Sequence, residues 1–70
     1  MKHPQKINIT PRDRLLRAWE NSMELVRDFE CYAAEIENNP KLCETFSEFA
    51  KDEGFHAARF RELLLEMEKQ

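Results

Sequence analysis

A glutamate and a histidine three residues apart, Glu53 and His56, are the side chains whose types and spacing best suit chemistry. On an α-helix, residues three apart leave from the same face, so a carboxylate and an imidazole at this spacing can reach one point. Glu-x-x-His pairs on the inner faces of helix bundles bind two iron or manganese ions. Carboxylate oxygens chelate or bridge hard cations, and neutral imidazole adds a nitrogen ligand. We therefore predict that Glu53 and His56 are metal ligands.

Both residues interrupt an apolar stripe, which makes their presence informative. The stripe alternates intervals of four and three residues, through Leu42, Phe46, Phe49, Glu53, His56, Phe60, Leu63 and Met67. Such spacing is typical of a helix that buries one face against a partner. A carboxylate left alone on that face would cost several kcal/mol in lost hydration. Metal coordination offsets this cost, and so does the structural alternative, in which Glu53 and His56 pair with each other or with an arginine.

Capping signals predict two helices around this stripe. Thr10, Pro11 and Asp13 supply a hydroxyl cap, a proline at the first helical position and an acid three residues after the cap. Pro40 disfavours helix at Asn39, while Asn39 can cap a new helix. The expected units are a flexible N-terminal arm over 1–9 and a helical hairpin over 10–70, with helix 1 at about 11–37 and helix 2 at about 40–68.

The first helix carries an apolar stripe of its own. Its members are Leu16, Trp19, Met23, Val26 and Ala33, with Leu15, Phe29 and Ile36 on the flank. Two helices joined by a short turn run antiparallel, and each leaves part of its stripe in water. A single core of this size rarely supplies more than roughly 3–5 kcal/mol of stability. We therefore predict an all-α fold, an antiparallel two-helix hairpin that dimerises into a four-helix bundle or forms an assembly of such dimers.

A two-metal site also needs a carboxylate from the first helix, and three glutamates compete for this role. Glu30 lies on the stripe but about one turn nearer the predicted turn than Glu53. Glu24 is nearly level with Glu53 but points away from the stripe, and Glu20 points outward too. Glu30 and Glu24 are the predicted further ligands, and the choice between them stays open.

Composition and charge exclude several classes of partner. The 70 residues carry a net charge of −3 with both signs interleaved, which offers nucleic acid no basic surface. No apolar run approaches the roughly 20 residues that cross a bilayer. No signal sequence precedes Cys31 and Cys43, so free thiols in a reducing cytoplasm are expected.

The second helix resembles a known family. Phe46, Ala50, Glu53, His56 and Ala57 stand as in the ferritin-like superfamily, particularly rubrerythrin-like proteins and short encapsulated ferritin-like proteins. The resemblance covers roughly residues 15 to 66 and is closest to the encapsulated type, which has one hairpin per chain and builds its iron site between two chains. It implies a ferritin-like bundle with two iron ions per dimer and an oxidoreductase activity of ferroxidase or peroxidase type. Manganese is the alternative metal.

The resemblance leaves the first-helix ligand and the partner open. On ungapped matching, the family's glutamate falls at or next to Met23, and a position two turns later, often tyrosine, holds Glu30. Either Glu24 or Glu30 then completes the site. A homo-oligomer and, by resemblance, a protein storage shell are the expected partners. The alternative function is a metal-free helical adaptor or structural dimer that keeps the ferritin-like fold.

Overall fold

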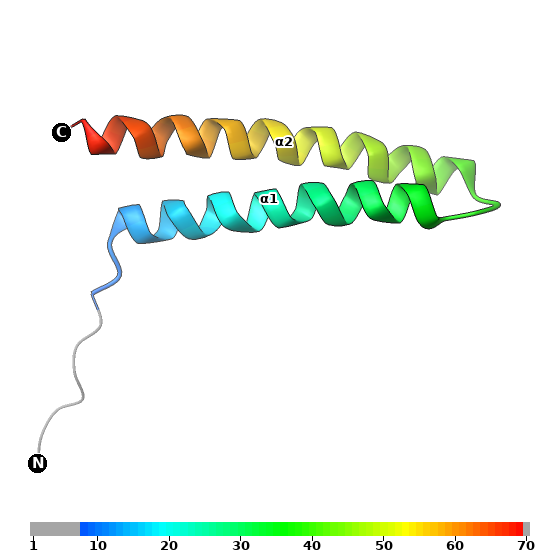
Figure 1. Ribbon diagram of the computed structural model, residues 1–70, viewed down its shortest axis with the longest axis horizontal. Helices are drawn as coiled ribbons and strands as arrows, with labels where there is room; N and C mark the ends of the chain where they lie inside the picture. The colour runs from blue at the N-terminus through cyan, green and yellow to red at the C-terminus, as the bar shows by residue number, and fades with distance from the viewer. Residues whose placement is uncertain (1–7, 70) are drawn as a thin grey trace, which may run out of the picture.

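The computed structural model describes residues 8–69, which form two antiparallel helices joined by a short turn (Figure 1). Helix α1 spans Pro11–Glu35 and helix α2 spans Pro40–Glu68. The predicted all-helical hairpin is therefore confirmed. Most of the predicted arm over 1–9 lies outside the described residues. Neither described helix has an apolar stretch long enough to cross a membrane.

Both helices begin where the capping signals place them. The Thr10 hydroxyl accepts from the Asp13 N–H at 3.1 Å, and the Asp13 carboxylate accepts from the Thr10 N–H at 3.0 Å. This reciprocal pair is a capping box, and the hydrogen bond from the Thr10 backbone lowers the pKa of the Asp13 carboxyl. The Asn39 side chain accepts from the Leu42 N–H at 3.1 Å at the start of α2. Each cap satisfies an N–H that has no carbonyl partner within its helix.

The connection between the helices is longer than expected, because α1 ends at Glu35 rather than near residue 37 and α2 begins at Pro40. Ile36 is already extended, with φ −73° and ψ 129°, although its N–H still bonds to the Tyr32 carbonyl. Asn38 follows with a φ of 62°, a left-handed conformation that asparagine tolerates better than most residues. α1 ends before residue 37 because Asn38 and Asn39 both take part in reversing the chain direction.

Mostly small residues, with one leucine, form the contact line between the helices. Among residues 8–69 only four are buried, namely Ser22, Ala50, Ala57 and Leu64. The three on α2 lie seven residues apart, so they share one side of the helix. The predicted α1 stripe is rotated from this line, since Ser22 is buried while Met23 remains 38% exposed. Most of the large apolar side chains are therefore left beside the contact line.

Contacts at both ends fix how the helices are aligned. Near the turn, the Phe29 ring lies 5.6 Å from Phe46 and 6.4 Å from Phe49, centroid to centroid. At the open end, Arg12 pairs with Glu68 at 3.2 Å. Residues near position 25 of α1 are therefore level with residues near position 54 of α2. The start of α1 and the end of α2 lie at the same end of the hairpin, opposite the turn (Figure 1).

Candidate functional site

Glu53 and His56 lie together on α2, as their spacing predicts. The Glu53 Oε1 atom is 3.5 Å from the His56 Nδ1 atom. The Glu53 side chain is 21% exposed, whereas the His56 side chain is 60% exposed. The Glu53 carboxylate is therefore partly buried, and the more exposed His56 imidazole lies beside it. Both side chains remain accessible to a ligand on this side of α2.

This pair lies on one of the two broad sides of the hairpin, which we call the Glu53 face. It carries the α2 row Leu42, Phe46, Phe49, Glu53, His56, Phe60, Leu63 and Met67, with Leu25, Phe29 and Tyr32 from α1. Tyr32 marks the α1 part, because its ring packs edge-on against Phe46 with a centroid distance of 5.4 Å. Tyr32 and Phe49 remain 43% and 49% exposed. The Glu53 face is thus an apolar surface with one ionisable pair at its middle.

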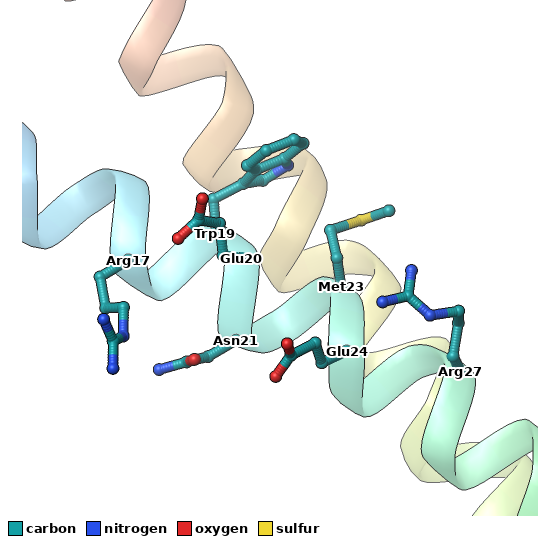
Figure 2. Close-up of a pocket in the computed structure, with 7 residues that line it drawn as sticks. All are labelled: Arg17, Trp19, Glu20, Asn21, Met23, Glu24 and Arg27. Atoms are coloured by element: carbon teal, nitrogen blue, oxygen red, sulfur yellow. The ribbon is translucent and has the colours of Figure 1, made fainter.

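Glu20 and Glu24 lie on the outer surface of α1, away from this pair. Both are exposed and border a shallow depression that also includes Arg17 and Arg27. Figure 2 shows Glu24 and Arg17 pointing away from α2, while Met23 lies on the side nearer that helix. Within one chain, the structure does not bring either glutamate next to Glu53.

Glu30 is exposed and lies on the opposite broad side of the hairpin. Each residue turns an α-helix by about 100°, so Glu30 leaves α1 about 200° away from Tyr32 and about 20° away from Met23. Tyr32 is on the Glu53 face, and Met23 is on the other side. Glu30 and the Glu53–His56 pair of one chain therefore face in opposite directions.

Asp28 is the α1 acid that shares the Glu53 face, and it is absent from the predicted ligands. It leaves α1 about 40° from Tyr32, and it lies only about half a helical turn nearer the loop than Glu53. The sequence does show that Asp28 and Tyr32 are four residues apart and therefore lie on the same side of a helix. That signal becomes usable only once the contact line of the hairpin is known to pass through Ser22.

The Glu53–His56 pair by itself is too small a set of donors for a metal centre. Among the described residues, no three His, Cys, Asp or Glu side chains gather closely enough to hold a metal ion. The donor types of Glu53 and His56 fit iron or manganese, which bind mixed oxygen and nitrogen ligands. Two donors are fewer than such ions take from a bundle core. A complete set requires donors from a second polypeptide.

The opposite broad side, which we call the groove face, contains a shallow apolar groove of about 380 Å³. Its lining comes from both helices and consists of Trp19, Met23, Val26, Gly54, Ala57, Ala58 and Arg61. Gly54 forms part of the hollow, because a Cβ atom added there would meet nothing within 4 Å. A glycine inside a helix costs about 0.5–1 kcal/mol of stability relative to alanine. Gly54 therefore does not stabilise α2, and what its missing side chain contributes is the hollow of the groove.

Both cysteines are free thiols and stand apart from the Glu53–His56 pair. The Cys31 Sγ atom donates to a Glu35 carboxylate oxygen at 3.2 Å, and this hydrogen bond, together with the carboxylate's negative charge, raises the pKa of the Cys31 thiol. The Cys43 Sγ atom donates to the Ile36 carbonyl at 3.2 Å, which satisfies an acceptor exposed by the end of α1. Neither contact prepares a nucleophile.

No protein-family model matches this chain, and no curated protein or solved structure is significantly similar to it.

Proposed function

We propose that the chain is one half of a ferritin-like homodimer that binds two iron ions between its subunits and handles iron by oxidising Fe(II) or reducing peroxide. The observation that carries the proposal is the place of Glu53 and His56, an ionisable pair at the middle of an otherwise apolar and partly exposed row. The apolar residues around the pair supply a reason for two chains to meet there.

The burial within a single hairpin supports pairing. No aromatic side chain among the described residues is fully covered, and Phe49 retains 49% exposure. Covering a large apolar side chain contributes about 1.5–3 kcal/mol, so the Glu53 face offers a strong driving force for association. A second hairpin laid on this face completes a four-helix bundle.

The α2 row suits an antiparallel partner of the same sequence. Its intervals read the same in both directions, so two α2 helices crossed by a twofold axis place each member against another member of the row. The matched positions are Leu42 with Met67, Phe46 with Leu63, Phe49 with Phe60, and Glu53 with His56. Apolar residues then meet apolar residues, and the two ionisable positions lie nearest the axis.

This pairing doubles the donor set at the axis. Each chain contributes one carboxylate and one imidazole, and two carboxylates so near the same axis would repel each other without a cation between them. Iron or manganese ions held by these side chains would offset that repulsion and would supply redox chemistry with oxygen or peroxide. The chain's own task is to hold the carboxylates in place and to keep bulk water out with the phenylalanines on either side.

The choice of the first-helix ligand stays open, and the hairpin adds one candidate to it. Glu24 is nearly level with the axis, although its side chain must bend around the edge of α1 to reach it. Glu30 points from the other face, and Asp28 shares the Glu53 face about half a helical turn from the level of Glu53. We retain Glu24 and Glu30 as proposed ligands and add Asp28 as a residue to test.

The test is the metal content of purified protein loaded anaerobically with Fe(II) and then desalted. We expect about one iron per chain, with the iron lost in Glu53→Gln and in His56→Gln. Asp28→Asn, Glu24→Gln and Glu30→Gln, measured separately, identify the first-helix ligand by partial loss. Glu62→Gln is the matched control, because Glu62 is an exposed α2 glutamate paired with Arg59 at 3.0 Å. Wild-type protein that retains no iron or manganese would reject the proposal.

The second candidate function, a metal-free helical adaptor or structural dimer, is favoured by one observation. The Glu53 carboxylate already has the His56 imidazole 3.5 Å away, which can stabilise it as an ion pair when the histidine is protonated. In this case the thermal unfolding temperature stays the same with Fe(II), with Mn(II) and with a chelator. A rise in that temperature with metal, lost in Glu53→Gln, contradicts the adaptor.

A further inference from the structure

The groove face has the shape of a surface prepared for contact, although nothing in the proposed function uses it. Trp19 and Met23 rise from α1 on one side of the groove, and Gly54, Ala57 and Ala58 form its floor on α2. Met23 remains 38% exposed beside this hollow. The same face therefore carries both large apolar side chains and a space without side chains.

Charged residues flank the groove in an arrangement that matches itself. By helix geometry, Arg12 and Glu30 leave α1 within about 20° of Met23, so both belong to the groove face. They lie at equal distances, nine residues each, on either side of Asn21. A twofold axis that crosses α1 near Asn21 therefore places Arg12 of one copy opposite Glu30 of another.

The second helix repeats this arrangement with another pair of unlike charges. Lys51 and Glu62 leave α2 within about 40° of Ala58, on the same face. Their midpoint falls between His56 and Ala57. This midpoint is level with the region around Asn21, because α1 and α2 are aligned by the end contacts of the hairpin. One axis thus brings together unlike charges on both helices.

We propose that the groove face docks against the groove face of a second copy of this chain, about a twofold axis that crosses the hairpin near Asn21 and Ala57. The large α1 side chains of each copy cover the hollow at Gly54 of the other, and the pairs Arg12–Glu30 and Lys51–Glu62 form between copies. Arg12 and Glu62 each have an exposed partner within the chain, Glu68 and Arg59, and their side chains retain 48% and 64% exposure for a further contact.

This contact is independent of the Glu53 face, because the two faces point in opposite directions. A chain that uses both surfaces belongs to two different twofold pairs at once, and the resulting assembly contains four chains or more. The groove contact holds whether or not Glu53 and His56 bind metal.

The experiment compares the solution mass of three variants with that of the full-length wild type by light scattering. Gly54→Leu fills the groove, and its Cβ atom meets nothing within 4 Å in the hairpin. Phe49→Lys places a charge on the Glu53 face, and Phe55→Lys is the control on the outer side of α2, where Phe55 is 74% exposed. Helix content measured by circular dichroism verifies that each variant folds.

We expect four or more chains in the wild type and in Phe55→Lys, two chains in Gly54→Leu, and two chains in Phe49→Lys. A Gly54→Leu protein with the mass of the wild type would overturn the groove contact, whether that mass is two chains or more, and would leave the proposed metal-binding dimer intact. If instead Gly54→Leu is a single chain and Phe49→Lys keeps its partner, the groove is supported and the proposed dimer fails.

A charge exchange tests the placement of the axis. Lys51→Glu replaces two symmetric attractions with repulsions, so the groove contact should weaken about tenfold at low salt. Adding Glu62→Lys in the same chain restores unlike charges and should recover the wild-type dissociation constant. A double variant as weak as the single one would show that Lys51 and Glu62 do not meet and would overturn the proposed axis.

Discussion

The two broad faces of this hairpin are built from different kinds of residue. The Glu53 face has large apolar side chains along its whole length, interrupted once by a carboxylate and an imidazole. The groove face has a hollow at Gly54, with unlike charges spaced about its centre. An interruption by ionisable residues in an apolar surface indicates chemistry, whereas a hollow flanked by balanced charges indicates recognition of a shape. Both arise because small residues along the contact line bring the helices together and leave the larger ones outside.

The largest expected effect comes from charging the Glu53 face. Phe49→Lys should remove about 1.5–3 kcal/mol of burial from each copy and abolish the dimer through this face. Since Phe49 is already 49% exposed in one chain, a monomeric hairpin would lose much less. Thermal unfolding at several protein concentrations measures the loss. Phe55→Lys should leave the unfolding temperature nearly unchanged, and equal effects of the two variants would remove the distinction between the faces.

Replacing the ionisable pair should sharpen the same comparison. Glu53→Leu with His56→Leu converts the middle of the row to apolar residues, and substituting a buried ion pair in this way often stabilises by about 1–4 kcal/mol. The metal-free double variant should therefore unfold at a higher temperature than the metal-free wild type while binding no iron. A destabilised double variant would mean that the pair contributes to folding rather than to metal binding.

A smaller effect is expected from the Thr10 cap, which stabilises α1 and therefore affects both faces of the hairpin equally. Thr10→Ala removes the hydroxyl of the capping box and should cost about 1 kcal/mol in unfolding free energy without changing the solution mass. Denaturant titration measures this cost. A change in mass would show that the start of α1 belongs to an interface.

The same cap gives a pH dependence with a definite sign. The pKa of the Asp13 carboxyl is lowered from its ordinary value of 3.8, so its contribution to stability is fully present above about pH 4. That contribution is lost as the pH falls through the lowered pKa of the folded state. Asp13→Asn should unfold with less dependence on pH in this range, and acid titration followed by circular dichroism compares the two proteins.

The smallest effect concerns a thiol that lies on neither face. The neighbouring Glu35 raises the pKa of the Cys31 thiol, which lowers the fraction of reactive thiolate at neutral pH. Glu35→Gln should therefore speed alkylation of Cys31 several-fold at the same pH. An unchanged rate, measured by mass spectrometry, would mean that the contact between Sγ and the carboxylate does not persist in solution.

Local signals were sufficient to predict the helices but not the faces. Thr10 and Asn39 correctly predict where the two helices begin, because capping depends only on neighbouring residues. The rotation of α1 depends on how closely the two helices approach, and Ser22, a polar residue on no apolar stripe, decides it. For this reason Glu30 was assigned to the stripe of α1 and yet faces away from Glu53. The role of Gly54 could not be read locally either, since an exposed helical glycine and a groove glycine look alike in sequence.

The turn at Asn38 and Asn39 also determines the linker length that a fused tandem of two copies requires. It returns the chain so that α1 begins beside the end of α2, as the Arg12–Glu68 pair shows. In an antiparallel dimer, the end of one chain then lies about 40 Å from the start of the other, the length of α2 at 1.5 Å per residue. A genetically fused tandem therefore needs at least about 12 residues in total between Glu68 of one copy and Pro11 of the next to reproduce that dimer, whereas a connection of four residues fits only parallel hairpins. The shortest linker that preserves the unfolding temperature reports the relative direction of the two copies without a further structure.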